Sequence, residues 1–166
     1  YSIGYVQHYS GHYSLAKLGA LLPTFFMSMC LVVAAGDVIL FLVVWELMSL
    51  SSYLLVVYEH HDAGARSAGW LYFVMTHIGT ACIAACLLFI SSSAGSTEFQ
   101  VMAASSGAGM SDLARSSAFL LALVGFGTKA GVMPLHVWLP KAHPAAPSNV
   151  SALMSGVMVK VAVYML

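Results

Sequence analysis

Charged side chains are scarce in this chain. Its 166 residues include six Lys or Arg and six Asp or Glu, so charged residues make up 7% of the sequence and the formal net charge is zero. About a quarter of the residues in a typical soluble domain are charged. The scarcity argues against a soluble globular domain, and the lack of net positive charge removes the electrostatic basis for binding nucleic acid.

Cysteine is also rare, and its positions argue against a disulfide framework or a metal site. Cys30, Cys82 and Cys86 all lie within apolar runs, where a free thiol behaves as a small hydrophobic side chain. No His or carboxylate lies close enough along the sequence to complete a metal site with Cys82 and Cys86. No motif of nucleophilic catalysis or phosphate binding is present either. We therefore expect no metal site and no catalytic residue.

Features of a natural start and stop are missing as well. The chain does not begin with Met, and its first residues lack the charged region and cleavage site of a signal peptide. It stops at Leu166 within an apolar stretch. We interpret residues 1–166 as an internal fragment of a single transmembrane domain.

Hydrophobic residues make up 60% of the sequence and form long runs. A membrane-spanning helix needs about 20 predominantly apolar residues. Five runs meet or approach this length, and they cover about 18–35, 38–58, 68–90, 118–134 and 149–166. The sequence therefore predicts an all-α polytopic membrane protein with five transmembrane helices.

Polar and aromatic residues mark the ends of these spans. Asp37 is the expected N-cap of the second span. The Ser, Gly and Ala-rich segment 91–117 predicts a loop that includes a short interfacial helix at 99–104. Trp70 and Trp138 lie near span ends, where aromatic side chains anchor helices at the membrane surface.

The stretch from Gly125 to Lys160 is the most unusual part of the chain. It contains two apolar segments, one with Lys129 and the other with Lys160, joined by a connector that includes His136 and is interrupted by Pro134, Pro140, Pro144 and Pro147. A Lys at the centre of a membrane helix costs roughly 2.5 to 3.5 kcal/mol on insertion scales, which makes both lysines candidates for function. The prolines predict a discontinuous helix near 118–147, whose open backbone must be buried in protein or line a wet cavity.

A carboxylate and a histidine also lie within predicted spans. Glu46, Ser49 and Tyr53 are spaced to share one face of the second span, and His77 lies in the third. Burial disfavours a charged lysine and a nearby carboxylate favours it, so a Glu/Lys pair whose separation changes can load and unload a proton. The alternative to a proton-loading pair is that Glu46 and one lysine form a static ion pair that only holds the helices together. His77 taken alone also fits a hydrogen-bonded core residue.

Basic residues in the loops suggest an orientation. If the spans alternate, Lys17, Arg66 and Lys141 share one side of the membrane and Arg115 lies on the other. The positive-inside rule then places the connector that contains Lys141 on the cytoplasmic side.

Three stretches resemble one known family. The stretch YSIGYV at 1–6 resembles the end of its third helix, VVWELMSLSSYLLV at 43–56 resembles its fifth helix, and GFGTKAGVMPLHVWLPKAHPAAPSNVSALMSGVMVKVAVY at 125–164 resembles its broken seventh helix and its eighth. The family comprises the proton-translocating, antiporter-like membrane subunits of complex I, of the multisubunit cation/proton antiporters and of group 4 hydrogenases. Within it, the second and third stretches are most similar to the large membrane subunit of hydrogenase-4 and formate hydrogenlyase.

The resemblance implies a fold and roles for particular residues. The chain would form helices four to eight, one inverted repeat of the antiporter-like fold. Glu46 would be the carboxylate of the Glu/Lys pair, Lys129 the pumping lysine and Lys160 the relay lysine. His77 falls where some relatives place an arginine, and His136 lies in the connector of the proton path.

The function implied is proton translocation in a membrane-bound hydrogenase or a related oxidoreductase of the prokaryotic plasma membrane. The subunit would hold no redox cofactor and would work with other membrane subunits and a soluble redox arm. A sodium/proton antiporter subunit and a pumping subunit of NADH-quinone oxidoreductase are alternatives that use the same residues. A third alternative is a membrane anchor whose charges only hold the helices together. Direct quinone reduction is a weaker alternative, because no residue pattern in the sequence indicates a quinone site.

Overall fold

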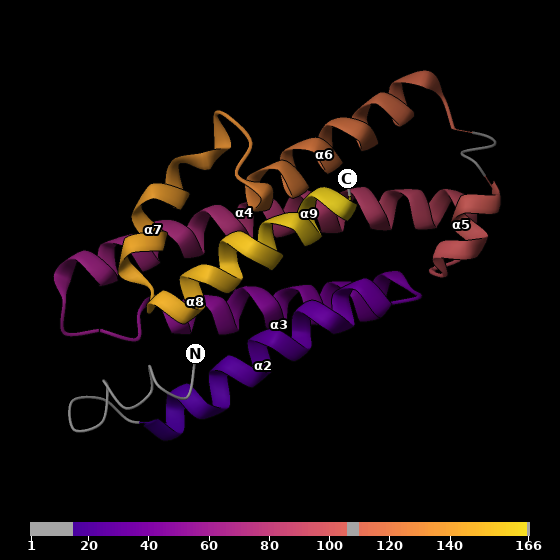
Figure 1. The fold of residues 1–166 in the computed structure, drawn as a ribbon. Helices are drawn as coiled ribbons and strands as arrows, with labels where there is room; N and C mark the ends of the chain where they lie inside the picture. The colour runs from indigo at the N-terminus through magenta and orange to yellow at the C-terminus, as the bar shows by residue number, and fades with distance from the viewer. Residues whose placement is uncertain (1–14, 106–109, 166) are drawn as a thin grey trace.

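The computed structural model describes residues 15–105 and 110–165, so the motif at 1–6 lies outside the described residues. Within the described ranges the chain is helical apart from short connections and one isolated bridge (Figure 1). Five segments are long and apolar enough to cross a membrane. The predicted all-α class with five spans is therefore confirmed.

The first two spans lie side by side. Helix α2 runs over Leu15–Ala34 and helix α3 over Val38–Val56. Asp37 ends the tight turn between them and caps α3, because its carboxylate accepts the backbone N–H groups of Ile39 and Leu40, both at 2.9 Å. The predicted cap is confirmed.

The third span is longer than its apolar run. Helix α4 covers Ala63–Ala94, so it begins within the polar loop that follows α3. The reason is Asp62, whose side chain accepts two backbone N–H groups of the first turn. Gly95 ends the helix in the left-handed region at φ 69°. The predicted interfacial helix follows as α5, Phe99–Ser105.

The fourth span is broken, as predicted. Helix α6 covers Asp112–Ala130 and ends at Gly131, which has φ 73°, a conformation that glycine adopts without steric strain. A short 3-10 helix, η1, follows at Leu135–Trp138, and helix α7 covers Leu139–Ala145 (Figure 1). The break leaves the carbonyl of Thr128 within reach of the connector.

Trp138 fills that break and corrects one prediction. The residue is fully buried rather than placed at the membrane surface, and its Nε1 donates to the Thr128 carbonyl at 2.8 Å. An open helix end needs such a partner when water is excluded. Trp70 is 65% exposed, which is compatible with an interfacial position.

The fifth span contains an unpredicted irregularity. Helix α8 covers Ser148–Leu153, a π-helical turn, η2, covers Met154–Met158, and helix α9 covers Val159–Met165. Single π turns within α-helices occur often at functional sites. This one ends two residues before Lys160.

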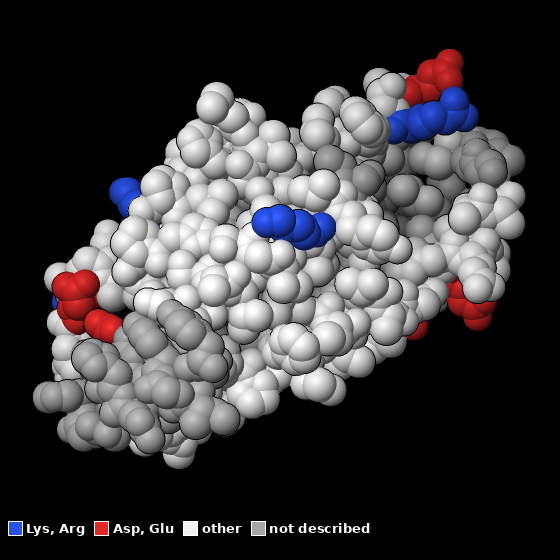
Figure 2. Space-filling view, in the orientation of Figure 1, with Lys and Arg blue, Asp and Glu red and all other residues white. Residues whose placement is uncertain are grey.

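Helices α4 and α6 approach each other closely at two glycines. A Cβ atom on Gly125 would lie 2.9 Å from the carbonyl oxygen of Gly79, and one on Gly79 would lie 3.1 Å from the carbonyl oxygen of Gly125. Small residues at such crossings let the backbones of membrane helices meet. On the face shown in Figure 2, charged side chains gather at the two ends of the molecule, except for one basic patch over α9.

Candidate functional site

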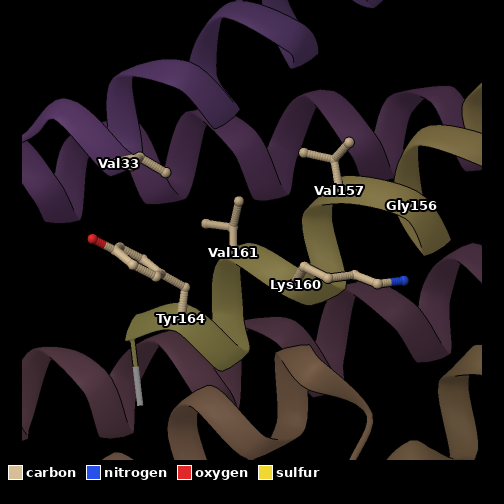
Figure 3. Close-up of a pocket in the computed structure, with 6 residues that line it drawn as sticks. All are labelled: Val33, Gly156, Val157, Lys160, Val161 and Tyr164. Atoms are coloured by element: carbon tan, nitrogen blue, oxygen red, sulfur yellow. The ribbon is translucent and has the colours of Figure 1, made fainter.

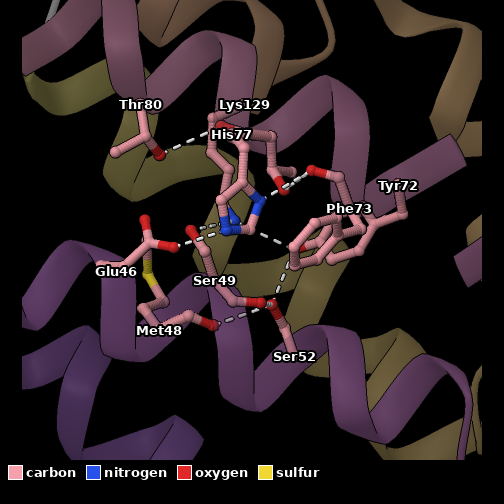
Figure 4. Close-up of polar contacts among 10 residues, drawn as sticks. Glu46, Met48, Ser49, Ser52, Tyr72, Phe73, His77, Thr80 and Lys129 are labelled. Atoms are coloured by element: carbon pink, nitrogen blue, oxygen red, sulfur yellow. Dashed lines mark hydrogen bonds and ion pairs between the residues drawn. The ribbon is translucent and has the colours of Figure 1, made fainter. Parts of the chain in front are cut away.

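Lys129 lies in the last turn of α6 and is 2% exposed. Its Nζ donates hydrogen bonds to Ser49 Oγ of α3 at 3.0 Å and to Tyr72 Oη of α4 at 2.9 Å (Figure 4). The same nitrogen lies 5.1 Å from the centre of the Tyr72 ring. Three helices therefore enclose the ammonium and supply the polar partners that a buried charge requires.

Tyr72 connects Lys129 to a second hydroxyl. Its Oη lies 2.6 Å from Ser52 Oγ, and Ser52 in turn donates to the Met48 carbonyl at 2.8 Å. When the Tyr72 oxygen accepts from a charged Lys129, its own proton can go to Ser52 Oγ or to Met158 Sδ at 3.6 Å. A neutral amine has a lone pair instead, and rotation of the Tyr72 hydroxyl supplies a donor for it. This cluster of hydroxyls can therefore satisfy Lys129 both with and without its extra proton.

Glu46 and His77 form a direct contact beside this cluster. Glu46 Oε1 lies 2.6 Å from His77 Nε2, and the two side chains are 31% and 32% exposed. His77 Nδ1 lies 2.8 Å from the Phe73 carbonyl one turn earlier in α4. Figure 4 shows both side chains between α3 and α4 on the side of Lys129.

The sequence-based hypothesis paired Glu46 with Lys129, and the structure arranges them differently. No Glu46 oxygen lies within 4.0 Å of Lys129 Nζ, and the ion-pair partner of Glu46 is His77. Glu46 still interacts electrostatically with Lys129. Ser49, predicted on the same face as Glu46, is the α3 residue that contacts the lysine. The two titratable groups are therefore neighbours without a direct bond.

Lys160 lies apart from this cluster. It is exposed on α9, and its Nζ donates to the Ser155 carbonyl within the π turn. It borders a cavity of about 250 Å³ between α2 and α9 whose other lining residues are mostly apolar (Figure 3). The structure thus brings Glu46, His77 and Lys129 together and leaves Lys160 on the outside of the described bundle.

The connector holds the remaining predicted residue. His136 lies in η1, and its Nδ1 is buried without a hydrogen-bond partner among the described residues. Two further polar groups lie nearby along the chain: His143 of α7 makes a 2.8 Å bond with Ser151 Oγ of α8, and Asn149 Nδ2 is buried and unpartnered within the described ranges. Such groups are suited to binding ordered water.

Sequence reasoning missed Tyr72 and Ser52, the residues that complete the site around Lys129. Both lie in strongly apolar spans, where a tyrosine or serine usually indicates packing or a local backbone bond. One signal was available for Ser52, because it lies one turn after Ser49 and therefore next to the polar face of Glu46 and Ser49. Nothing in the sequence around Tyr72 distinguishes it from its aromatic neighbours.

Known proteins share the sequence and the fold of this chain. The chain is 43% identical over 164 residues to hydrogenase-4 component B of Escherichia coli, covering 99% of this chain and 24% of that protein. Its fold resembles a subunit of the membrane-bound sulfane sulfur reductase, an archaeal respiratory membrane complex, with a TM-score of 0.85, 22% identity and coverage of 93% and 31% of the two chains. It also resembles a subunit of the Mrp complex from Dietzia sp. DQ12-45-1b, with a TM-score of 0.75, 26% identity and coverage of 87% and 27%.

A family match covers most of the sequence. The family described as NADH:quinone oxidoreductase/Mrp antiporter, transmembrane, matches residues 35–166. The chain spans about a quarter of the length of hydrogenase-4 component B. The resemblance noted from the sequence is thereby confirmed, and so is placement in the membrane. This chain is an integral membrane protein that belongs to the NADH:quinone oxidoreductase/Mrp antiporter family of transmembrane subunits.

Proposed function

We propose that this chain forms a proton-loading site in a proton-translocating subunit of a membrane-bound hydrogenase or a related respiratory oxidoreductase. Lys129 is the group that takes up and releases the proton. Glu46 tunes the affinity of Lys129 for that proton through their electrostatic interaction, since a negative neighbour favours the charged lysine and a neutral one does not.

The observation that carries the proposal is the environment of Lys129. The residue is 2% exposed, and both of its side-chain partners are hydroxyls rather than a carboxylate. A directly paired lysine would be locked in its charged form, whereas hydroxyls accept from the ammonium and donate to the amine. This is the chemistry needed for reversible proton loading.

Lys160 is the onward step in this proposal. An ammonium exposed on an apolar membrane helix is costly, and Lys160 is bonded to the Ser155 carbonyl within the π turn. His136 Nδ1 and Asn149 Nδ2 are buried and have no hydrogen-bond partner among residues 15–105 and 110–165, which supports an entry path for water through the connector. Protons would enter there from the cytoplasmic side, load Lys129 and pass toward Lys160.

The proposed setting is a multisubunit membrane complex. The relative from Escherichia coli is named as a component of hydrogenase-4, and the two structural neighbours belong to complexes. Other membrane subunits and a soluble redox arm would supply the driving signal, and this subunit would carry no redox cofactor.

A sodium/proton antiporter subunit is the second candidate. The likeness to a subunit of the Mrp complex, at 26% identity, supports it. The two functions differ in their energy source: an antiporter moves protons in response to a sodium gradient, whereas a redox-coupled subunit moves them only during electron transfer. Proton uptake measured with each driving force separately distinguishes the two.

The test uses the full-length protein in its assembled complex, reconstituted in vesicles. We expect Lys129→Ala to abolish proton uptake during turnover, and the control Lys17→Ala, at an exposed position in the first turn of α2, to leave it unchanged. Normal uptake by an assembled Lys129→Ala complex would exclude the proposal. If replacing Glu46 and Lys129 together by apolar residues of similar volume also preserved energy conversion, the two charges would be a static structural device.

A further inference from the structure

His77 has both ring nitrogens engaged, and this determines where its protons are. Nδ1 lies 2.8 Å from the Phe73 carbonyl oxygen, and Nε2 lies 2.6 Å from Glu46 Oε1. A carbonyl oxygen only accepts hydrogen bonds, so Nδ1 must carry a hydrogen. The state of Nε2 then depends on Glu46 alone.

Two protonation states fit the short contact between Glu46 and His77. If the imidazole is neutral, Nε2 has a lone pair and Glu46 must be a carboxylic acid that donates to it. If the imidazole is charged, Nε2 carries the hydrogen and Glu46 is a carboxylate that accepts it. Without any proton between them, two lone pairs would face each other at 2.6 Å. The contact therefore contains one proton in either state.

We propose that Glu46 and His77 together hold one exchangeable proton, and that the loss of this proton turns Glu46 into the counter-anion of Lys129. With the shared proton the pair has no net charge in either form. When the proton leaves, the pair carries one negative charge next to Lys129. His77 thus converts a fixed carboxylate into a switchable one.

The proposed step conserves protons and charge. The proton between Glu46 Oε1 and His77 Nε2 leaves the pair, and the lone pair of a neutral Lys129 Nζ takes up a proton. The pair becomes negative and the lysine becomes positive, so the total charge is unchanged. No oxidant or other co-reactant is required. Ser49, which bonds to Lys129, lies one turn after Glu46 on the same face of α3, so the two positions are neighbours.

The second oxygen of Glu46 supports the neutral form of the pair in this structure. Glu46 Oε2 is buried and has no hydrogen-bond partner among the described residues. Leaving an oxygen of an ionised carboxylate unpaired costs more than leaving the carbonyl oxygen of a carboxylic acid unpaired, because the acid oxygen carries less charge. A protonated Glu46 that donates through Oε1 therefore fits the contacts best.

The surrounding titratable groups leave Lys129 as the natural exchange partner. The elements packed against α4 carry Glu46 and Tyr53 on α3, Asp112, Arg115 and Lys129 on α6, His136 on η1, and Lys141 and His143 on α7. Asp112 and Arg115 lie at the opposite end of α6 from Lys129. Lys129 interacts electrostatically with Glu46 and bonds to Ser49, which lies one turn after Glu46 on the same helix. His143 is already bonded to Ser151.

Two replacements of His77 separate a shared proton from a static ion pair. His77→Arg supplies a permanent positive charge, which holds Glu46 ionised and leaves no proton to exchange. His77→Gln keeps a neutral hydrogen-bond donor. In the full-length complex in vesicles, we expect both to lower proton uptake per turnover by about a hundredfold, the lower end of what a positioned proton-transfer group contributes. A static pair predicts wild-type uptake for His77→Arg.

Infrared difference spectroscopy gives a second readout that does not depend on transport. The carbonyl stretch of a protonated carboxylic acid should be present in the wild-type protein, absent in Glu46→Gln and absent in His77→Arg. A Glu46 acid band that persists in His77→Arg, or no such band in the wild type at any pH where the complex is active, would overturn the inference.

This inference rests on the proposed function, and the two can fail separately. If Lys129→Ala pumps normally, the proposed function fails. If Lys129→Ala is inactive while His77→Arg pumps at the wild-type rate, the loading site remains and only the shared proton is excluded. Redox turnover of each purified complex checks that the variants have assembled.

Discussion

Lys129 and Lys160 have matching sequence environments, but they differ in burial and in their hydrogen-bond partners. Each lies in an apolar span four residues after a glycine, Gly125 in one case and Gly156 in the other. Lys129 is buried under α3 and α4 and bonds to two side-chain hydroxyls. Lys160 is exposed and bonds to a backbone carbonyl of its own helix.

The glycines show where the difference comes from. At Gly125 an added Cβ would lie 2.6 Å from Ile83 Cγ1 and 2.9 Å from the Gly79 carbonyl oxygen, so α4 packs directly against α6 there. At Gly156 nothing lies within 4 Å of that position. Close packing brings Tyr72 of α4 to Lys129, and Lys160 has no equivalent neighbour among the described residues. The helix packed against Lys129 therefore gives it the enclosed, hydrogen-bonded position on which the proposed loading site rests.

Replacing each lysine by arginine should separate the two positions most strongly. Arginine keeps the charge but does not release a proton in proteins, so we expect proton uptake to fall by about a hundredfold or more at either position if both relay protons. Only Lys129→Arg should also lower the midpoint of thermal unfolding, because its enclosed site has no room for the larger guanidinium. Unfolding of the purified variants in lipid nanodiscs measures this. Equal loss of stability at both positions would contradict the comparison.

Adding one methyl group at each glycine tests the packing itself. We expect Gly125→Ala to destabilise the protein by about 1 to 3 kcal/mol, the usual cost of overpacking, since the backbone of Gly79 cannot move away easily. Gly156→Ala should change stability by less than about 0.5 kcal/mol, as surface substitutions do. Unfolding in nanodiscs again provides the readout. A large effect at Gly156 would mean that a part of the protein outside the described residues packs closely there.

Removing one tyrosine hydroxyl tests the partner of Lys129. Tyr72→Phe keeps the ring that contacts Trp138 at a centroid distance of 4.9 Å but removes the oxygen that accepts from Lys129. We expect a loss of about 1 kcal/mol in stability, in the range for a buried donor left without a partner, together with slower proton uptake. Tyr164→Phe on α9, where the ring is 73% exposed, is the matched control and should be neutral. Wild-type uptake by Tyr72→Phe would show that Ser49 alone suffices.

The smallest loss of stability is expected at Ser52, which contacts Tyr72 rather than Lys129 itself. Ser52→Ala removes the hydroxyl that lies 2.6 Å from Tyr72 Oη without touching Lys129. The Tyr72 hydroxyl keeps a weak alternative acceptor in Met158 Sδ at 3.6 Å, so we expect a loss of about 0.5 kcal/mol, the low end for one hydrogen bond. Ser51→Ala, whose hydroxyl bonds only to backbone of α3, is the control. An effect as large as that of Tyr72→Phe would mean that Ser52 sets the hydroxyl direction.

The sequence by itself determined the number of spans, the Asp37 cap and the residues that need an explanation. Hydropathy along the chain is enough to find five apolar runs, Asp37 before an apolar run predicts a cap, and an ionisable residue within a span is anomalous wherever its neighbours lie. Glu46, His77 and Lys129 were all identifiable on that basis. The proline-rich connector likewise predicted the break after α6.

The tertiary structure decided which of these groups meet. The bonds from Lys129 to Ser49 and Tyr72 join residues 80 and 57 positions apart in the sequence. Such contacts depend on how each helix is rotated and how far it slides along its neighbour, and hydropathy carries no information on either. For the same reason, the burial of Trp138 in the helix break, the π turn before Lys160 and the choice of His77 rather than Lys129 as the direct partner of Glu46 became visible only in the packed helices.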